Sequence, residues 1–169
     1  QYLGLEMLDL SGCPQLNRVS AYGNNLQTLV LGDKPQLTTL DLAGNALQEL
    51  DLNGCPSLES LYTNGNNLQT LVLGDKPQLT NLLLEGNALQ ELDLNGCPSL
   101  VYLSANENNL QTLVLDDKPQ LTSLSLGRNA LQELDLSGCP SLESLSAYEN
   151  NLQTLVLGDK PQLTNLYVP

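Results

Sequence analysis

The chain has 169 residues, which is long enough for a sizeable core, and we expect residues 1–169 to form one domain. Its apolar content is 41%, dominated by leucine and without Phe or Trp, so we expect a core of one repeated shape. The net charge of −13 argues against binding to nucleic-acid phosphates or to anionic membranes. No stretch is long and apolar enough to span a bilayer, so we expect no membrane insertion.

The chain repeats itself from its first residues, and no signal-peptide pattern precedes the repeat, although a removed signal would leave secretion open. The repeat keeps a constant interval, and a leucine marks it at Leu26, Leu47, Leu68, Leu89, Leu110, Leu131 and Leu152. Eight prolines recur with the same period, starting at Pro14. A fixed period of this size, about 21 residues, indicates a solenoid, here of about eight coils.

Each coil contains two similar halves. Residues 37–45 read LTTLDLAGN and residues 47–55 read LQELDLNGC, so both halves follow the pattern L-x-x-L-x-L-x-x-(N/C/K). Leu40 and Leu42 flank Asp41, which predicts a strand with both leucines on its inner side and the aspartate outside. No helical period appears anywhere, so we expect short extended segments in both halves and no long helices.

The pattern resembles that of the leucine-rich repeat family, whose strand segment reads LxxLxLxxN or LxxLxLxxC. The nested spacing of the two halves resembles a short bacterial class of that family, and the resemblance covers essentially the whole chain. It implies a mainly β, parallel solenoid with a concave parallel sheet and an extended or turn-rich convex side. It also implies an inward asparagine ladder beside the concave sheet, formed by Asn24, Asn45, Asn66, Asn87, Asn108, Asn129 and Asn150.

The half that ends in Cys or Lys is nearly constant. It alternates between LQTLVLGDKP and LQELDLNGCP, so the full repeat unit consists of two coils. Like charges directly opposite one another destabilise a sheet, and Val72 separates Asp51 from Asp93 in the stack. Doubling the period places such charges about 9.6 Å apart, near the screening length in physiological salt.

The half that ends in Asn varies at its outward positions. Tyr and Arg, which are enriched at binding hot spots, lie mainly in this half. We expect exposed Leu83 and Val101 to form a small apolar patch with Tyr62 and Tyr102. The sequence therefore predicts a recognition scaffold that binds a protein or peptide on the Asn-half, concave face. The candidate partner-binding residues are Tyr62, Leu83, Tyr102, Glu85, Glu107, Arg128, Tyr148 and Glu149.

Catalytic chemistry is not indicated. The chain has no His, and no Ser or Cys has a visible activating neighbour, so we predict no enzyme activity and no cofactor. The four cysteines lie two coils apart, about 9.6 Å in the stack, which is too far for a disulfide or a shared zinc ion. We expect four buried thiols. The turn containing Asp33 and Lys34 lacks a calcium signature, and these two charges should partly neutralise each other.

Two origins fit the near-identity of the constant half. One is an engineered or consensus scaffold with no natural ligand, favoured by the absence of insertions. The other is a bacterial surface or secreted adhesin-type protein of which this chain is a fragment, favoured by irregular coils such as residues 16–21. Localisation stays open, being extracellular or cell-surface if the protein is natural. Neither end shows a polar cap, so the ends could self-associate.

Overall fold

The structure, a computed structural model, describes residues 4–168, and within that range it contains sixteen short strands and no helix. The Asn half supplies the even-numbered strands β2 (Arg18–Ser20), β4 (Thr39–Asp41), β6 (Ser60–Tyr62), β8 (Asn81–Leu83), β10 (Tyr102–Ser104), β12 (Ser123–Ser125), β14 (Ser144–Ser146) and β16 (Asn165–Tyr167). The other half supplies the odd-numbered strands β1 (Met7–Asp9), β3 (Thr28–Val30), β5 (Glu49–Asp51), β7 (Thr70–Val72), β9 (Glu91–Asp93), β11 (Thr112–Val114), β13 (Glu133–Asp135) and β15 (Thr154–Val156).

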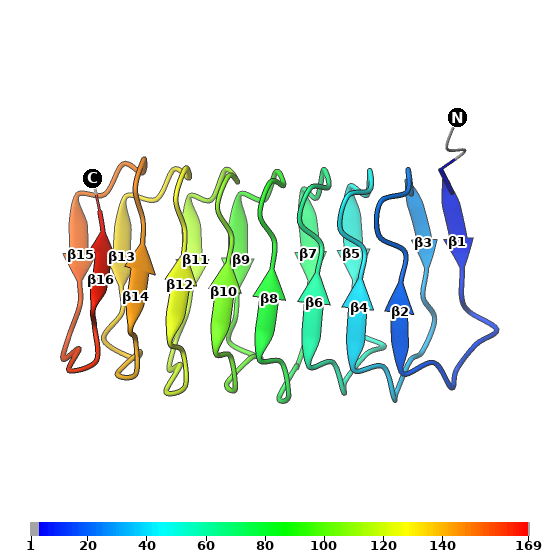
Figure 1. Cartoon of the computed structure of the whole chain (residues 1–169), viewed down its shortest axis with the longest axis horizontal. Coiled ribbons are helices and arrows are strands. Elements are labelled where there is room, and N and C mark those ends of the chain that lie inside the picture. Colours follow the sequence, from blue (N-terminus) through cyan, green and yellow to red (C-terminus); the bar gives the residue numbers. More distant parts are fainter. Residues whose placement is uncertain (1–3, 169) are drawn as a thin grey trace.

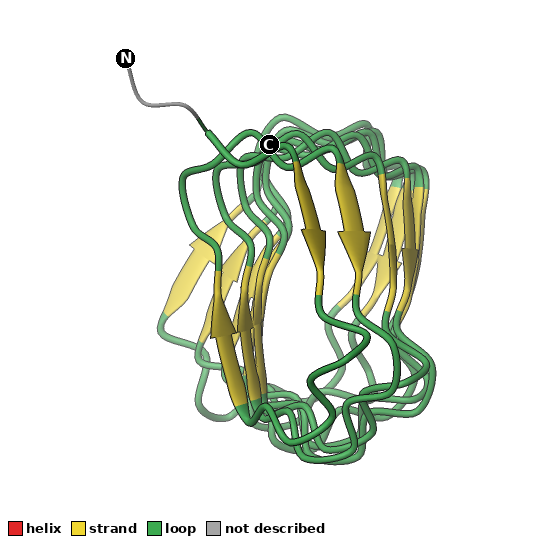
Figure 2. Ribbon diagram, turned by 90° about the vertical axis from the view of Figure 1, so that its right-hand side faces the viewer, coloured by secondary structure: helices red, strands yellow, loops and turns green. Residues whose placement is uncertain are grey.

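The strands form two layers of a parallel solenoid. In Figure 1 the coils are stacked along the long axis, with even strands in front and odd strands behind them. Figure 2, which looks along the stack, shows the two layers on opposite sides of the interior. The prediction of a parallel solenoid of about eight coils of about 21 residues without long helices is confirmed.

Rows of leucine fill the interior. The middle residue of each even strand from β4 to β14 points inward and is buried, and the parallel register stacks Leu40, Leu61 and Leu82 directly on one another. Residues 37–52 alone bury six leucines, each at most 5% exposed. Burial of a leucine contributes about 1.5–3 kcal/mol. Because the contacts lie between coils, this stability is shared by neighbours.

The predicted asparagine ladder is present beside the even strands. In Asn66, Oδ1 accepts the backbone N–H of Leu47 at 3.0 Å, while Nδ2 donates to the carbonyls of Leu42 and Thr63 at 2.9 and 3.0 Å. Leu42 belongs to the preceding coil, so each such asparagine ties two coils together. Equivalent bonds are made by Asn45, Asn87, Asn108, Asn129 and Asn150.

The two layers differ in continuity. The even strands form one eight-stranded parallel sheet, whereas the odd strands form four separate pairs, β1–β3, β5–β7, β9–β11 and β13–β15. Three seams therefore interrupt the odd layer, one after every second coil. A stack that curves must space its coils more widely on its convex side, so the interrupted pairing fits the odd side being convex and the even side concave.

Two turn geometries alternate with the same period as the seams. After β5, the Oδ1 of Asp51 accepts the backbone N–H of Asn53 at 2.9 Å, which closes a tight Asx turn. After β7, Val72 replaces the aspartate, and Gly74 turns the chain with a φ of 64°. The odd strands thus pair within a two-coil unit and not between units.

The corner after the odd strands contains Cys and Lys side chains that alternate from one coil to the next. Cys55, Cys97 and Cys139 are buried as predicted, but Cys13 is exposed, since within the described chain a coil covers it on one side only. Lys34, Lys76 and Lys118 are also almost completely buried, at 0–1% exposed.

These lysines do not pair with the neighbouring aspartates as expected. The Nζ of Lys34 donates to the backbone carbonyls of Leu31 and Asp33. Among the described residues, both ion pairs involve Arg128 instead. The ammonium group is therefore held by carbonyl dipoles of its own turn, which satisfies it without a carboxylate.

Candidate functional site

The outer surface of the even strands, here called the even face, contains the predicted apolar patch of Tyr62, Leu83 and Tyr102. Tyr62 on β6 lies directly opposite Leu83 on β8, and Tyr102 on β10 lies opposite Asn81. Tyr102 is 37% exposed. Leu83 and Val101, which we expected to be exposed, are half-buried, as is Tyr62. The patch thus extends over three neighbouring strands, but its side chains are only partly exposed.

A second feature lies where the chain leaves the even strands. At one turn position, every coil adopts the left-handed backbone conformation. The first four coils place glycine there, Gly23, Gly44, Gly65 and Gly86, with φ between 66° and 68°. The next three coils place Glu107, Arg128 and Glu149 there, with φ of 54°, 57° and 52°. We call these three residues the charged row.

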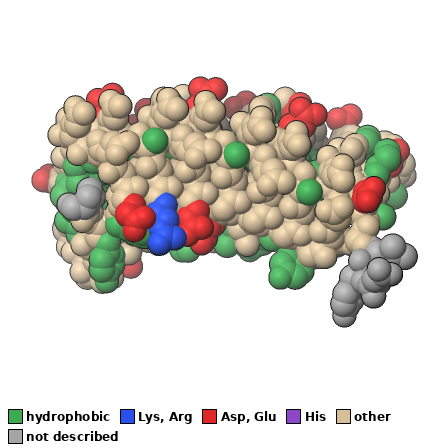
Figure 3. Space-filling view, turned by 90° about the horizontal axis from the view of Figure 1, so that it is seen from above, with side chains coloured by type: hydrophobic (Ala, Val, Ile, Leu, Met, Phe, Trp, Pro, Cys, Tyr) green, Lys and Arg blue, Asp and Glu red, His purple; other side chains and the backbone are tan. Residues whose placement is uncertain are grey.

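The charged row is held together by ion pairs across three coils. The Nη1 of Arg128 donates to Glu107 at 2.6 Å and its Nε donates to Glu149 at 3.1 Å. The hydrogen bond to Glu107 is the main cause that raises the pKa of Arg128, and Glu149 raises it further. Figure 3 shows a basic group between two acidic groups on this part of the surface.

Two neighbours complete the environment of Arg128. Its guanidinium carbon lies 5.9 Å from the centre of the Tyr148 ring, within range of a cation–π contact. A Cβ at Gly127 would overlap that ring, so the ring packs against the bare backbone of Gly127. The Oδ1 of Asn106 accepts the backbone N–H of Gly127 at 2.7 Å.

The structure thus divides the predicted site residues into two groups. Tyr62, Leu83 and Tyr102 form the apolar patch. Glu107, Arg128 and Glu149 make up the charged row, and Tyr148 lies beside Arg128. Glu85 is exposed after β8 but makes no side-chain hydrogen bond among the described residues.

The sequence did not predict hollows on the opposite side, the odd face. One hollow of about 480 Å³ lies across β11, β13 and β15, and another of about 600 Å³ lies across β3, β5 and β7. The alternation of Val and Asp at the third strand position was a visible signal for them. No residue pattern indicated the seams, because the pairing of the odd strands depends on turn geometry.

No metal site is evident in residues 4–168, where no three His, Cys, Asp or Glu side chains are grouped to hold an ion. The same part of the chain contains no helix long and apolar enough to cross a membrane.

The parallel coils, leucine rows and asparagine ladder form a solenoid similar to that of leucine-rich repeat proteins. The structural neighbours are bacterial leucine-rich repeat proteins with repeats of about 21 residues in a solenoid, which confirms the resemblance seen in the sequence. No protein-family model matches the chain, and no curated protein matches it either.

Three solved structures show the likeness in detail. The functional domain of InlJ from Listeria monocytogenes, which includes a cysteine ladder, is 27% identical with a TM-score of 0.72, over 96% of this chain and 41% of that one. YopM from Yersinia pestis, a leucine-rich effector protein, is 28% identical with a TM-score of 0.66, over 96% and 48%. YopM from Yersinia enterocolitica, at 24% identity and a TM-score of 0.53 over 95% and 48%, shares the fold. The chain spans less than half the length of each.

Proposed function

We propose that the protein is a non-catalytic recognition scaffold that binds a protein or peptide on its even face. The observation that carries this proposal is the charged row. Glycine occupies the same left-handed turn position in four coils, so side chains at Glu107, Arg128 and Glu149 are not required by the fold. A left-handed conformation costs a residue with a Cβ about 1 kcal/mol. Strained residues of this kind concentrate at functional sites.

The charged row presents an ordered group to a partner. Arg128 is bracketed by two carboxylates and lies beside Tyr148, so its guanidinium is oriented before any ligand arrives. Two of its five N–H donors are used in these bonds, which leaves others for a partner's carbonyl or carboxylate oxygens. Preorganisation reduces the entropy lost on binding.

The apolar patch supplies the second element of an interface. Tyr62, Leu83 and Tyr102 come from three neighbouring strands of one continuous sheet, so their relative positions are fixed. A buried aromatic cluster with a polar rim is the usual arrangement of binding hot spots. The bacterial neighbours, one of them an effector protein, support interaction with another protein as the general role.

A test is to select binders from a displayed random-peptide library against the wild-type protein. Their affinities are then measured for a variant that restores glycine in the charged row, Glu107→Gly with Arg128→Gly and Glu149→Gly. We expect at least about a tenfold loss, which corresponds to roughly 1.4 kcal/mol.

The matched control changes three exposed residues of the odd strands, Thr70→Gly with Thr112→Gly and Thr154→Gly. These residues should not alter binding of even-face ligands. Selected peptides that bind the charged-row variant as tightly as the wild type, while the control variant loses them, would overturn the proposal.

A further inference from the structure

The odd face carries most of the negative charge of the molecule. Thirteen of the 19 acidic residues belong to the odd half, and all are exposed: Glu6, Asp9, Asp33, Glu49, Asp51, Asp75, Glu91, Asp93, Asp116, Asp117, Glu133, Asp135 and Asp159. None of the four lysines of this half is exposed, since their amines point to backbone carbonyls inside the corner. The outer surface of this half is therefore acidic and has no exposed cation of its own.

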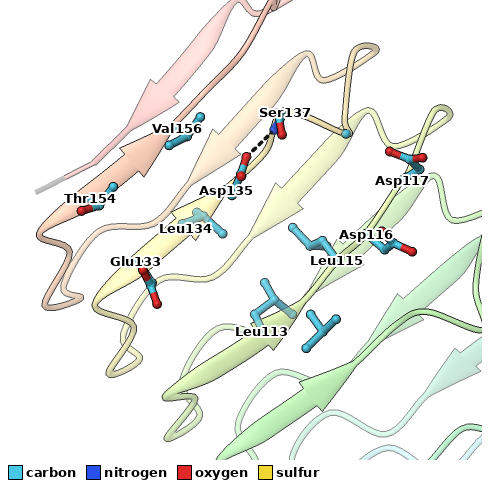
Figure 4. A pocket seen from close by; sticks show the side chains of 12 residues that line it. Leu113, Leu115, Asp116, Asp117, Glu133, Leu134, Asp135, Ser137, Thr154 and Val156 are labelled. Atoms are coloured by element: carbon cyan, nitrogen blue, oxygen red, sulfur yellow. Dashed lines mark hydrogen bonds between the residues drawn. The ribbon is translucent and has the colours of Figure 1, made fainter.

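The hollows of this face combine these carboxylates with apolar walls. The hollow across β11, β13 and β15 has Glu133 and Asp135 at its centre, with Val114 and Val156 on the flanking strands (Figure 4). The side chains of the four wall valines, Val30, Val72, Val114 and Val156, are 37–43% exposed.

The same arrangement recurs along the stack. The hollow across β3, β5 and β7 places Glu49 and Asp51 between Val30 and Val72. A third hollow, of about 380 Å³, brings Val72 together with Asp93 at the next seam. The three hollows thus lie at equivalent seams, each two coils from the next, and the third is a smaller version lined by one valine and by Asp93 without the neighbouring glutamate.

A lysine or arginine side chain fits the chemistry of each hollow. Its methylene stem can lie against the valines, and its charged end can reach the carboxylates. The Glu and Asp of one strand are two residues apart and point to the same side, so a single cation can contact both. An anionic or purely apolar group would meet uncompensated carboxylates.

The spacing of the hollows selects the shape of the partner. Two coils correspond to about 9.6 Å along the stack at the spacing of paired strands, and to slightly more where a seam separates the odd strands. In polyproline II three residues form one turn and advance by about 9.3 Å, so every third side chain points to the same side of the chain. A peptide with a basic residue at every third position therefore matches the period of the hollows.

We propose that the odd face binds an extended cationic peptide segment, with Lys or Arg at every third residue, lying along the solenoid axis. Three successive basic side chains occupy the hollows centred on Asp51, Asp93 and Asp135. This surface is opposite to the even face, and its use does not depend on the function proposed for that face.

The spacing is tested with three labelled peptides of the same composition, each with three lysines among alanines and prolines. The lysines lie at every third position, at every second position, or adjacent to one another. Fluorescence anisotropy at about 0.15 M salt measures their affinities. We expect the first peptide to bind about tenfold more tightly, as three exposed ion pairs of ordinary strength would give. Equal affinities would mean unspecific charge attraction and would overturn the proposal.

The site is tested with Glu49→Gln, Glu91→Gln and Glu133→Gln in one protein. Their exposed side chains make no hydrogen bond among the described residues, so folding should be preserved, as urea unfolding will verify. A matched variant, Glu59→Gln with Glu85→Gln and Glu143→Gln, removes the same charge from the even half. We expect the first variant to lose the preference for the three-residue spacing and the second to keep it. Equal losses would contradict the proposal.

Discussion

Asn66 and Leu42 belong to successive coils, and the Nδ2 of Asn66 donates to the backbone carbonyl of Leu42 at 2.9 Å. The same side chain accepts the N–H of Leu47 at the start of the odd half of the preceding coil. One buried amide thus joins the even layer, the odd half and the preceding coil. The carbonyl of Leu42 also accepts from the Nδ2 of Asn45 at 2.8 Å, so the group that depends on Asn66 is the buried N–H of Leu47, which would be left without a partner.

We predict that Asn66→Ala destabilises the protein by about 3 kcal/mol, because the N–H of Leu47 loses its partner and the carbonyls of Leu42 and Thr63 each lose one of two donors. Asn64→Ala is the control, since Asn64 lies outside the ladder and should change the free energy of unfolding by about 0.5 kcal/mol or less. Urea unfolding measures both. Similar values for the two variants would contradict the structural role of the ladder.

The buried lysines give a second prediction. Burial lowers the pKa of Lys76, yet its ammonium donates to the carbonyl of Asp75 at 3.2 Å. Lys76→Met keeps the stem and removes the donor, so we expect a loss of about 1–3 kcal/mol from unpaired carbonyls. Gln78→Met is the exposed control. An equally or more stable Lys76→Met would show that the cost of burying the charge exceeds the gain from its hydrogen bonds.

Thiol reactivity separates Cys13 from the other cysteines. Burial raises the pKa of Cys55 and Cys139 and raises that of Cys97 to about 11. A thiol reagent at neutral pH should therefore modify Cys13 rapidly and the other three only after unfolding. Mass spectrometry counts the labels over time. Rapid modification of Cys97 in the native protein would mean that the corner is not closed.

Asp135 gives a pH dependence. Hydrogen bonds from Ser137 lower the pKa of Asp135 below its ordinary value of 3.8. Its contribution to stability is therefore complete above that value and is lost as the pH falls through the lower, folded-state pKa. The urea midpoint of Asp135→Ala should lie below the wild-type midpoint at pH near 7, and the two should converge in strong acid. Thr154→Ala on the next strand is the control. A difference that grows with acidification would reverse the assigned sign.

Arg128 should contribute to ligand binding while contributing little to the net stability of the fold. Arg128→Gly relieves the left-handed strain, worth about 1 kcal/mol, and loses two half-exposed ion pairs of about the same total. We expect the free energy of unfolding to change by less than about 0.5 kcal/mol, while even-face ligands bind less tightly. A large loss of stability would assign Arg128 to the fold instead.

The sequence predicts the coils well because each inward leucine and ladder asparagine recurs at a fixed interval. The burial of Lys34 was not predicted, because lysine is seldom buried. The one sequence signal for it is that Lys34 occupies the same repeat position as Cys13 and Cys55, which we expected to be buried. The seams depend on the left-handed turn at Gly74, which residue type alone does not reveal. The candidate residues were grouped correctly by half, but the bracketing of Arg128 required the register of neighbouring turns.

The central claim is that the even face recognises a partner on a scaffold that does not need those side chains. The most direct measurement titrates a selected ligand against two variants with matched truncations. One has alanine at Tyr62, Leu83 and Tyr102, and the other has alanine at Val72, Val114 and Val156. We predict that the dissociation constant rises at least about tenfold for the first variant only, and that the two variants have similar free energies of unfolding. Failure to obtain any ligand, or a loss confined to the second variant, would contradict the claim.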